Sequence, residues 1–337
     1  MITMAHGSGG KAMKDLIDAI FLDAFDNEEL AKLDDQARFT LATLQAHGDR
    51  LALTTDSYVV FPIFFPGGDI GKLAVAGTVN DLAVGGAKPL YLTCSFILEE
   101  GLAVADLRRI VQSIKETALT AGVTIVTGDT KVVERGSADK IFINTAGIGV
   151  IASNIDLGPA NARPGDVVLI NGTIGDHGAA IVQARGDLAI DSNIQSDCRP
   201  LNSLIAAMLQ ICPHIRSLRD ATRGGIATVL NEFAAASNMC FRIDETAIPL
   251  KSEVRGICEI LGLDPYYLAN EGKIVAVVPA EEAEAILACM RAHPDGKESA
   301  IIGEVMQTPE NMVVLKTIFG GVKVLDMLVG DQLPRIC

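Results

Sequence analysis

The chain has 337 residues, 49% of them hydrophobic, with a formal net charge of -14 and a pI near 4.8. This length suits two globular domains, and the negative charge argues against an electrostatic grip on nucleic acid or an anionic membrane. Because the sequence has neither a signal-peptide pattern nor an apolar run of about 18 residues, we expect a cytoplasmic protein.

The first half of the chain alternates strand and helix patterns. Hydrophobic periodicity predicts helices at 11–21, 70–87 and 104–122, and strands at 50–60, 90–98, 123–129 and 140–151. Such alternation is typical of a mixed α/β domain.

A proline- and glycine-rich stretch near residues 155–165 predicts a domain junction. Beyond it, strands are predicted at 166–172, 273–278, 300–305 and 312–316, and helices near 201–211, 223–236, 252–262 and 279–293. We therefore expect domains at 1–155 and 156–326, followed by a flexible tail at 327–337.

Three aspartates stand out in the first domain. Asp56 in TTDSYVV and Asp129 in TGDTKVV each follow an apolar strand pattern, and Asp81 lies beside Asn80 in a helix of small apolar residues. A buried carboxylate needs a cation or a tight set of hydrogen bonds. Each aspartate alone is most simply a turn or cap residue, but the three with Asn80 favour a shared site for Mg²⁺ and nucleotide phosphate.

Other features of the first domain fit a phosphate site. The glycine-rich turn HGSGGK, with His6, Gly7, Gly9 and Gly10, precedes a helix and could cradle phosphate, although a flexible arm explains it equally well. In TGDTKVV, Lys131 follows Asp129 and Thr130 and could neutralise phosphate oxygens; a surface lysine is the alternative.

The second domain adds two segments. In LRDATRGG, Asp220 ends an apolar stretch, Thr222 is a candidate N-cap, and Arg223 precedes a glycine pair at a helix start. The segment NEGK places Glu271 just before a strand. By itself NEGK is an ordinary turn.

The cysteines are odd in number and lack a CxxC pair, which argues against a disulfide framework and a zinc site. They are Cys94, Cys198, Cys212, Cys240, Cys258, Cys289 and Cys337. Most are expected to be reduced core residues, but Cys337 ends the chain in DQLPRIC, where we expect an exposed thiol on a poorly ordered terminus.

In chain order, the motifs HGSGG, TTDSYVV, GTVNDLAVGGAKP, TGDTKVV, DATRGG, NEGK and PRIC resemble the ATP-using superfamily of aminoimidazole ribonucleotide synthetase, selenophosphate synthetase and thiamine monophosphate kinase. Within it the chain is most similar to the HypE family of hydrogenase maturation proteins. The resemblance implies two mixed-sheet domains with an ATP cleft between them, and a homodimer formed by the N-terminal sheets.

The resemblance also implies an activity and partners. A carbamoyltransferase, HypF, loads a carbamoyl group onto the Cys337 thiol, and ATP drives its dehydration from thiocarbamate to thiocyanate. The cyano group then passes to iron on the HypC–HypD scaffold, for a nickel-iron hydrogenase. In this scheme Mg²⁺ is held by Asp56, Asp81, Asp129 and Asp220, Lys131 holds the transferred phosphoryl group, and Glu271 is the base.

Two alternatives remain at this stage. Another ATP-dependent synthetase or small-molecule kinase of the superfamily would not need the terminal thiol. A non-enzymatic scaffold would use the tail as a docking peptide. The cluster of acidic residues favours a catalyst.

Overall fold

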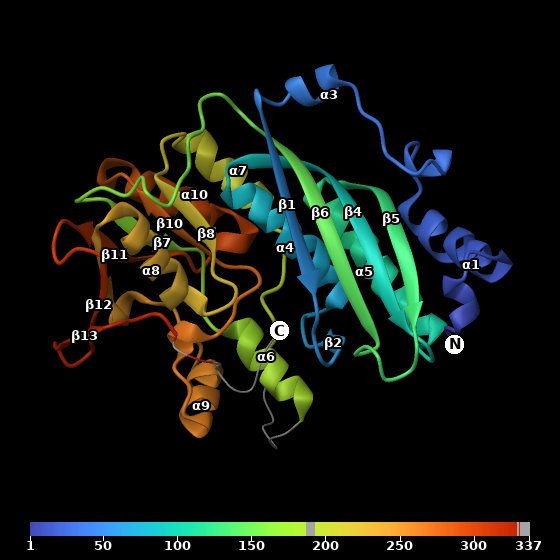
Figure 1. Cartoon of the computed structure of the whole chain (residues 1–337). Helices are drawn as coiled ribbons and strands as arrows, with labels where there is room; N and C mark the ends of the chain where they lie inside the picture. The colour runs from blue at the N-terminus through green and yellow to red at the C-terminus, as the bar shows by residue number, and fades with distance from the viewer. Residues whose placement is uncertain (187–192, 329, 331–337) are drawn as a thin grey trace.

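The computed structural model describes residues 1–186, 193–328 and 330. They form a four-stranded sheet from the first half of the chain and a seven-stranded sheet from the second, side by side and each covered by helices (Figure 1). The predicted mixed α/β fold is confirmed. No helix of the described residues is long and apolar enough to cross a membrane.

The four-stranded sheet has the order β1-β6-β4-β5, so β1 and β5 are its outer strands. β4 and β5 are parallel, and the other neighbours are antiparallel. Its strands are β1 (Arg50–Tyr58), β4 (Ala87–Glu99), β5 (Thr124–Val133) and β6 (Ile141–Ile151).

Two helices, α4 (Ile70–Val84) and α5 (Val104–Ala121), cover one face of this sheet (Figure 1). α4 is buried along most of its length because its side chains are small and apolar. The Asp69 carboxylate caps it by accepting the N–H groups of Gly71 and Lys72 at 2.8 and 3.0 Å.

The other face of the sheet has no helix of the described chain on it. On a strand, alternate side chains point to opposite faces, and the side chains of Leu51, Leu53 and Ile97 on this side are 57%, 69% and 42% exposed. We call these three residues the open face. An apolar face of this kind is a candidate contact surface.

Short helices precede β1 and run beside β5 (Figure 1). Gly7 lies against β5, since a Cβ on Gly7 would come within 2.9 Å of Val132. These segments are η1 (Met4–Gly7), α1 (Lys11–Leu16), η2 (Ile17–Leu22), α2 (Asp23–Phe25), η3 (Leu30–Lys32) and α3 (Leu41–Gln45). A small hairpin, β2 (Phe64–Phe65) with β3 (Gly68–Asp69), leads into α4.

The second sheet has the order β13-β12-β9-β11-β7-β10-β8. Among its described pairs only β9 and β12 are parallel. The strands are β7 (Val167–Ile170), β8 (Ser217–Asp220), β9 (Cys240–Asp244), β10 (Ile274–Val278), β11 (Ala300–Met306), β12 (Met312–Lys316) and β13 (Val322–Val324).

Helices cover both faces of the second sheet. Val275 and Val277 of β10 pack in the same core as α8, and Ile274 and Ala276 pack in the core of α7 and α10. β10 is therefore buried on both faces, as its continuous apolar sequence indicates. The helices on these two faces are α7 (Asn202–Ile211), α8 (Gly225–Ser237) and α10 (Ala283–Ala292). α6 (Asp176–Arg185) and α9 (Ser252–Leu261) pack instead in the hydrophobic core of the first half. The short turns are η4 (Glu245–Ala247), η5 (Pro265–Tyr267), η6 (Ala280–Glu282) and η7 (Pro294–Gly296).

Some local predictions need correction. β1 and β5 continue past Asp56 and Asp129, so these residues lie within strands rather than after them. Thr222 is not the N-cap of α8; Gly224 is, with a φ of 74° that favours glycine. The sequence analysis missed the elements α3, α6, β2, β3, β8, β9 and β13, which are short or of mixed polarity.

The cysteines of the described residues are all free thiols, buried at five positions and half-buried at Cys289. This agrees with the expectation of reduced core residues. Cys337 lies outside the described residues, as do residues 329 and 331–336 of the predicted tail.

Candidate functional site

A cavity of about 380 Å³ lies between the two halves of the molecule. β1 and α4 form one wall, and β8, the segment between β8 and α8 and the turn before β10 form the other. We call it the cleft pocket; its charged residues are Asp56, Asp81, Asp220, Glu271, Arg219 and Arg223. Five of these six are sequence-predicted site residues, and Arg219 was not predicted.

Regular structure places the carboxylates of the cleft pocket. Asp81 lies on α4, and the Thr54 hydroxyl of β1 donates a hydrogen bond to its Oδ2 at 3.1 Å. Asp220 is the last residue of β8 and lies opposite Ile274 of the antiparallel strand β10. Because Glu271 comes three residues before Ile274, this pairing brings Glu271 to the same end of the sheet as Asp220.

Burial and mutual repulsion raise the pKa values of the pocket carboxyls. Burial raises the pKa of Asp220 to about 7, with Asp81 adding to the effect. Burial and then Asp56 raise the pKa of Asp81. The pKa of Glu271 lies well above its usual range because of burial, followed by the charges of Asp197, Asp220, Asp56 and Asp81. The cleft pocket is therefore a strongly acidic environment that favours bound protons or cations.

Asn80, which the sequence predicted as a ligand-binding residue, makes hydrogen bonds to backbone groups of another segment. Its side chain is 2% exposed; the amide Nδ2 donates to the carbonyl of Arg199 at 3.1 Å, and Oδ1 accepts the N–H of Leu201 at 2.7 Å. Since both functional atoms are engaged by backbone, Asn80 connects α4 to the 199–201 segment.

Apart from Cys337, the remaining predicted residues lie on β5 or in the N-terminal turn whose Gly7 packs against it, at the other edge of the sheet. We call them the β5 group: His6, Gly7, Gly9, Gly10, Asp129, Thr130 and Lys131. Neighbouring strands lie about 4.8 Å apart, so β1 and β5, separated by three spacings, are roughly 14 Å apart. The prediction that Asp129 shares one site with Asp56, Asp81 and Asp220 is thus not met within the single chain.

In the β5 group, Asp129 has its own cation. The ammonium of Lys131 lies 2.7 and 2.6 Å from the two carboxylate oxygens of Asp129, and this contact holds the Asp129 pKa below its usual range. Asp129 and Thr130 line a separate cavity of about 510 Å³ beside the N-terminal helices. His6 is engaged locally, where its Nδ1 accepts the Thr3 N–H at 3.0 Å.

The metal prediction can be tested against these positions. Within residues 1–186, 193–328 and 330, no three His, Cys, Asp or Glu side chains are grouped closely enough to hold a metal ion. The set of four aspartates is therefore not assembled. Asp56, Asp81 and Asp220 still line one pocket and offer only hard oxygen donors, which suits Mg²⁺.

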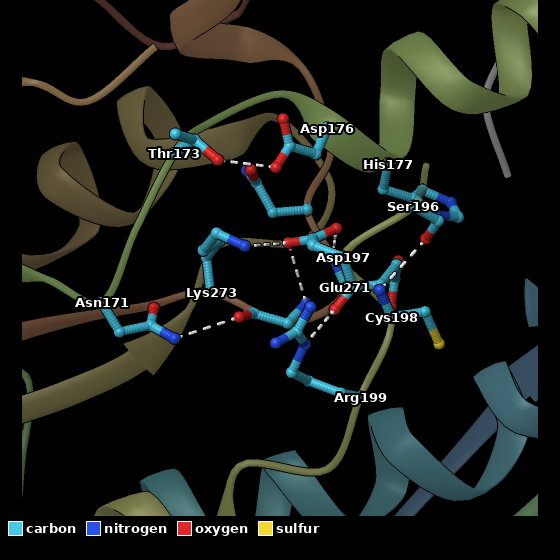
Figure 2. A network of polar contacts seen from close by, with 12 residues as sticks. Asn171, Thr173, Asp176, His177, Ser196, Asp197, Cys198, Arg199, Glu271 and Lys273 are labelled. Atoms are coloured by element: carbon cyan, nitrogen blue, oxygen red, sulfur yellow. Dashed lines mark hydrogen bonds and ion pairs between the residues drawn. The ribbon is translucent and has the colours of Figure 1, made fainter. Parts of the chain in front are cut away.

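A buried polar network behind Glu271 escaped the sequence analysis (Figure 2). Asp197 accepts the N–H groups of Glu271 and Gly272 and pairs with the Lys273 ammonium at 3.0 Å. Asp197 lies 74 residues before Glu271 in the unremarkable stretch QSDCRP, so no local pattern connects the two.

Comparison with known proteins identifies relatives over the full length. The AIR synthase related protein N-terminal and C-terminal domain families match residues 33–151 and 163–316. Carbamoyl dehydratase HypE of Rhodobacter capsulatus is 55% identical over 100% of this chain and 98% of its own.

Two solved structures are close. A crystal structure of hydrogenase maturation protein HypE in complex with ATP has 48% identity and a TM-score of 0.94, and the match covers 100% of both chains. A HypE chain from a crystal structure of a HypE–HypF complex has 50% identity and a TM-score of 0.80, covering 93% of this chain and 99% of that one.

Proposed function

This chain belongs to the HypE family of carbamoyl dehydratases among the AIR synthase related proteins, and we propose that it uses ATP to dehydrate a thiocarbamate on its own Cys337 to a thiocyanate. The cyano group would serve the active site of a nickel-iron hydrogenase. The structural observation that carries the proposal is the convergence of Glu271 with Asp56, Asp81 and Asp220 in one pocket between the two halves.

The chemistry requires a phosphoryl donor and a base. The carboxamide oxygen of Sγ–C(=O)–NH₂ attacks the γ-phosphorus of ATP and releases ADP, while one N–H proton leaves. Phosphate then departs with the C–O bond as the second N–H proton is removed, which gives Sγ–C≡N. The balance is thiocarbamate plus ATP to thiocyanate, ADP and phosphate, because the oxygen of the lost water remains on phosphate.

Glu271 is the best-placed base for the carboxamide protons. It lines the cleft pocket and its side chain is buried. A raised pKa makes its ionised form a stronger proton acceptor than an exposed glutamate, and a base works best when its pKa approaches the working pH. The repulsion that raises this pKa comes in part from three carboxylates that a cation would neutralise.

One or two of the pocket carboxylates Asp56, Asp81 and Asp220 would hold Mg²⁺ together with phosphate oxygens of ATP, which is how Mg²⁺ usually binds. The ion, when bound, supplies positive charge to the phosphate oxygens of ATP. The carboxylates supply the donor oxygens, and Arg223 adds positive charge to the lining of the pocket, while the lining residue Arg219 is paired with Glu232 at 3.0 Å. The ATP complex of the relative with a TM-score of 0.94 supports ATP as the nucleotide.

A homodimer formed through the open face would bring in the β5 group. Two copies stacked face to face, with the two-fold axis along the strands, place β5 of one copy opposite β1 of the other. Asp129 and Lys131 of the second copy then approach the cleft pocket of the first. The site would join an acidic half with a half that carries a lysine and a glycine-rich turn.

The carrier role of Cys337 and the partners follow from the same chemistry. Sulfur is nucleophilic enough to accept a carbamoyl group and leaves a transferable product. Met327 and Cys337 are ten residues apart, and an extended segment of that length spans roughly 33 Å. We infer that HypF loads the thiol, as the complex of a relative supports, and that the HypC–HypD scaffold receives the cyano group.

Intact-mass measurement tests the carrier and the reaction together. The purified protein is incubated with the carbamoyltransferase system, before and after Mg-ATP, with the Cys337→Ala variant in parallel. We expect a gain of about 43 Da that falls by about 18 Da on adding ATP, and no gain in the variant. An identical adduct on the variant, or none on wild type, would favour a small-molecule synthetase of the superfamily.

A further inference from the structure

We propose that Asp197 is a positioning residue that fixes the direction of Glu271 into the cleft pocket. This inference rests on the proposed role of Glu271 as the base. It adds a residue from a different part of the chain and assigns it an action through the backbone of the 271–272 turn.

Asp197 binds two consecutive backbone amides. Its Oδ1 accepts the N–H of Glu271 at 3.1 Å, and its Oδ2 accepts the N–H of Gly272 at 3.1 Å (Figure 2). A carboxylate that binds two successive N–H groups fixes the orientation of the peptide between them. That peptide sets the direction in which the Glu271 side chain leaves the backbone.

The carbonyls of the turn are engaged as well. The N–H of Arg199 donates to the Glu271 carbonyl at 3.3 Å, and Nδ2 of Asn171 donates to the Gly272 carbonyl at 3.1 Å. Every backbone donor and acceptor of Glu271 and Gly272 thus has a partner. The backbone of the turn is therefore held at all four of its polar groups.

Burial prevents water from replacing these contacts. Asp197 is 2% exposed and Lys273, whose ammonium lies 3.0 Å from Oδ2 of Asp197, is 7% exposed. A Cβ on Gly272 would come within 2.0 Å of the Asp197 carbonyl oxygen, so the turn packs directly on the 197 backbone. Burial disfavours ionised Asp197, but Lys273, His177 and the turn amides outweigh it and lower the Asp197 pKa.

The same segment reaches the other wall of the pocket. Asn80, next to Asp81 on α4, holds the Arg199 carbonyl and the Leu201 N–H. Residues 197–201 therefore connect Asp81 of the first half to Glu271 of the second through hydrogen bonds at both ends. The connection keeps the base at a set position relative to the carboxylates that would hold the metal.

The Asp197→Asn variant tests this positioning role. The side-chain oxygen of Asn can still accept one N–H of the turn. Its NH₂ group, however, replaces Oδ2, which accepts hydrogen bonds from the Gly272 N–H and from the Lys273 ammonium. We expect the single-turnover dehydration rate of carbamoylated protein to fall about 100-fold, the scale for misplacing a reacting group by about 1 Å. The affinity for a non-hydrolysable ATP analogue should stay within about threefold of wild type. Amide hydrogen exchange in the 270–274 peptide should accelerate.

Two further variants separate positioning from general destabilisation. Lys251→Met removes a different ion pair of the region, Lys251 with Asp176 at 2.9 Å, which does not contact the turn; it should leave the rate and the 270–274 exchange unchanged. In Asp197→Asn/Lys273→Met no buried ammonium is left unpaired, so the melting temperature should recover toward wild type while the rate stays low.

Specific results would overturn the inference. They are a rate that recovers with the melting temperature in the double variant, an equal rate loss in Lys251→Met, or unchanged 270–274 exchange in Asp197→Asn. Failure of the base assignment is recognised separately, because Glu271→Gln would then dehydrate at the wild-type rate. If Asp197→Asn showed faster amide hydrogen exchange at 270–274 but dehydrated at the wild-type rate, Asp197 would be a structural residue only.

Discussion

The cleft pocket and the β5 group differ in how the negative charge of their carboxylates is compensated. In the pocket, burial and neighbouring carboxylates raise the pKa values of Asp81, Asp220 and Glu271. In the β5 group, the exposed Asp129 is paired with Lys131, and its pKa is lowered. The carboxylates of the cleft pocket therefore repel one another, whereas the Asp129 carboxylate of the β5 group is neutralised by the Lys131 ammonium. Within one chain the sequence-predicted residues thus lie in two separate groups, and we propose that a second copy of the chain unites them.

The largest expected effect concerns whether the two halves work together. Glu271→Gln and Lys131→Met should each lower the dehydration rate by about 10²- to 10⁴-fold, since one removes the base and the other a cation for the phosphoryl group. The rate is measured by intact mass after Mg-ATP addition to the carbamoylated protein.

A mixed dimer distinguishes the arrangements. If each site takes Glu271 from one copy and Lys131 from the other, a heterodimer of the two variants contains one intact site and should recover about half of the wild-type activity. Purification with two different tags isolates this heterodimer. No recovery would place both residues in a site of one chain and contradict the completion of the pocket by the β5 group.

A smaller effect, the pH dependence of stability that Asp220 causes, tests the electrostatic difference between the two regions. Folded Asp220 keeps its proton up to about pH 7, whereas the unfolded side chain releases it near its ordinary pKa of 3.8. Between these pH values the unfolded state binds fewer protons, so stability falls as pH rises from about 4 to 7. Asp220→Asn should remove this loss and gain on the order of 1 kcal/mol at pH 8 in EDTA.

Thermal unfolding as a function of pH checks the prediction for Asp220. Asp244, whose pKa is lowered to about 2 by Thr246 and Lys316, serves as the matched control. Asp244→Asn should not gain stability at pH 8. An unchanged pH dependence in Asp220→Asn would mean that burial and the neighbouring carboxylates do not raise the pKa of Asp220 as inferred.

The smallest effect belongs to the β5 group. Lys131 and Asp129 have side chains that are 61% and 55% exposed, and exposed ion pairs contribute little. Lys131→Met should therefore change the free energy of unfolding by less than about 1 kcal/mol in urea titrations. If the free energy of unfolding fell by several kcal/mol, Lys131 would be a structural residue. A lower dehydration rate in Lys131→Met could then not be assigned to the loss of a phosphate-binding cation.

Much of the molecule could be predicted from local sequence. Helices such as α5 and strands such as β10 follow from hydrophobic periodicity, because burial of one face or of both faces leaves a repeating pattern. The cost of an unpaired carboxylate in an apolar helix indicated Asp81, and the positions of Asp56 and Asp220 at the ends of apolar stretches indicated the other two pocket aspartates. Glu271 was identified only through the family resemblance, because NEGK by itself is an ordinary turn.

The tertiary structure alone decided which of these motifs meet. Spacing along the chain does not show that β1 and β5 are opposite edges of one sheet, which separates Asp129 and Lys131 from the other predicted residues. Nor does it show that Asp197 reaches the backbone of Glu271, because that contact depends on how two distant segments pack. Hydrophobic patterning is a local property of the chain, whereas the pairing of buried polar groups depends on the finished fold.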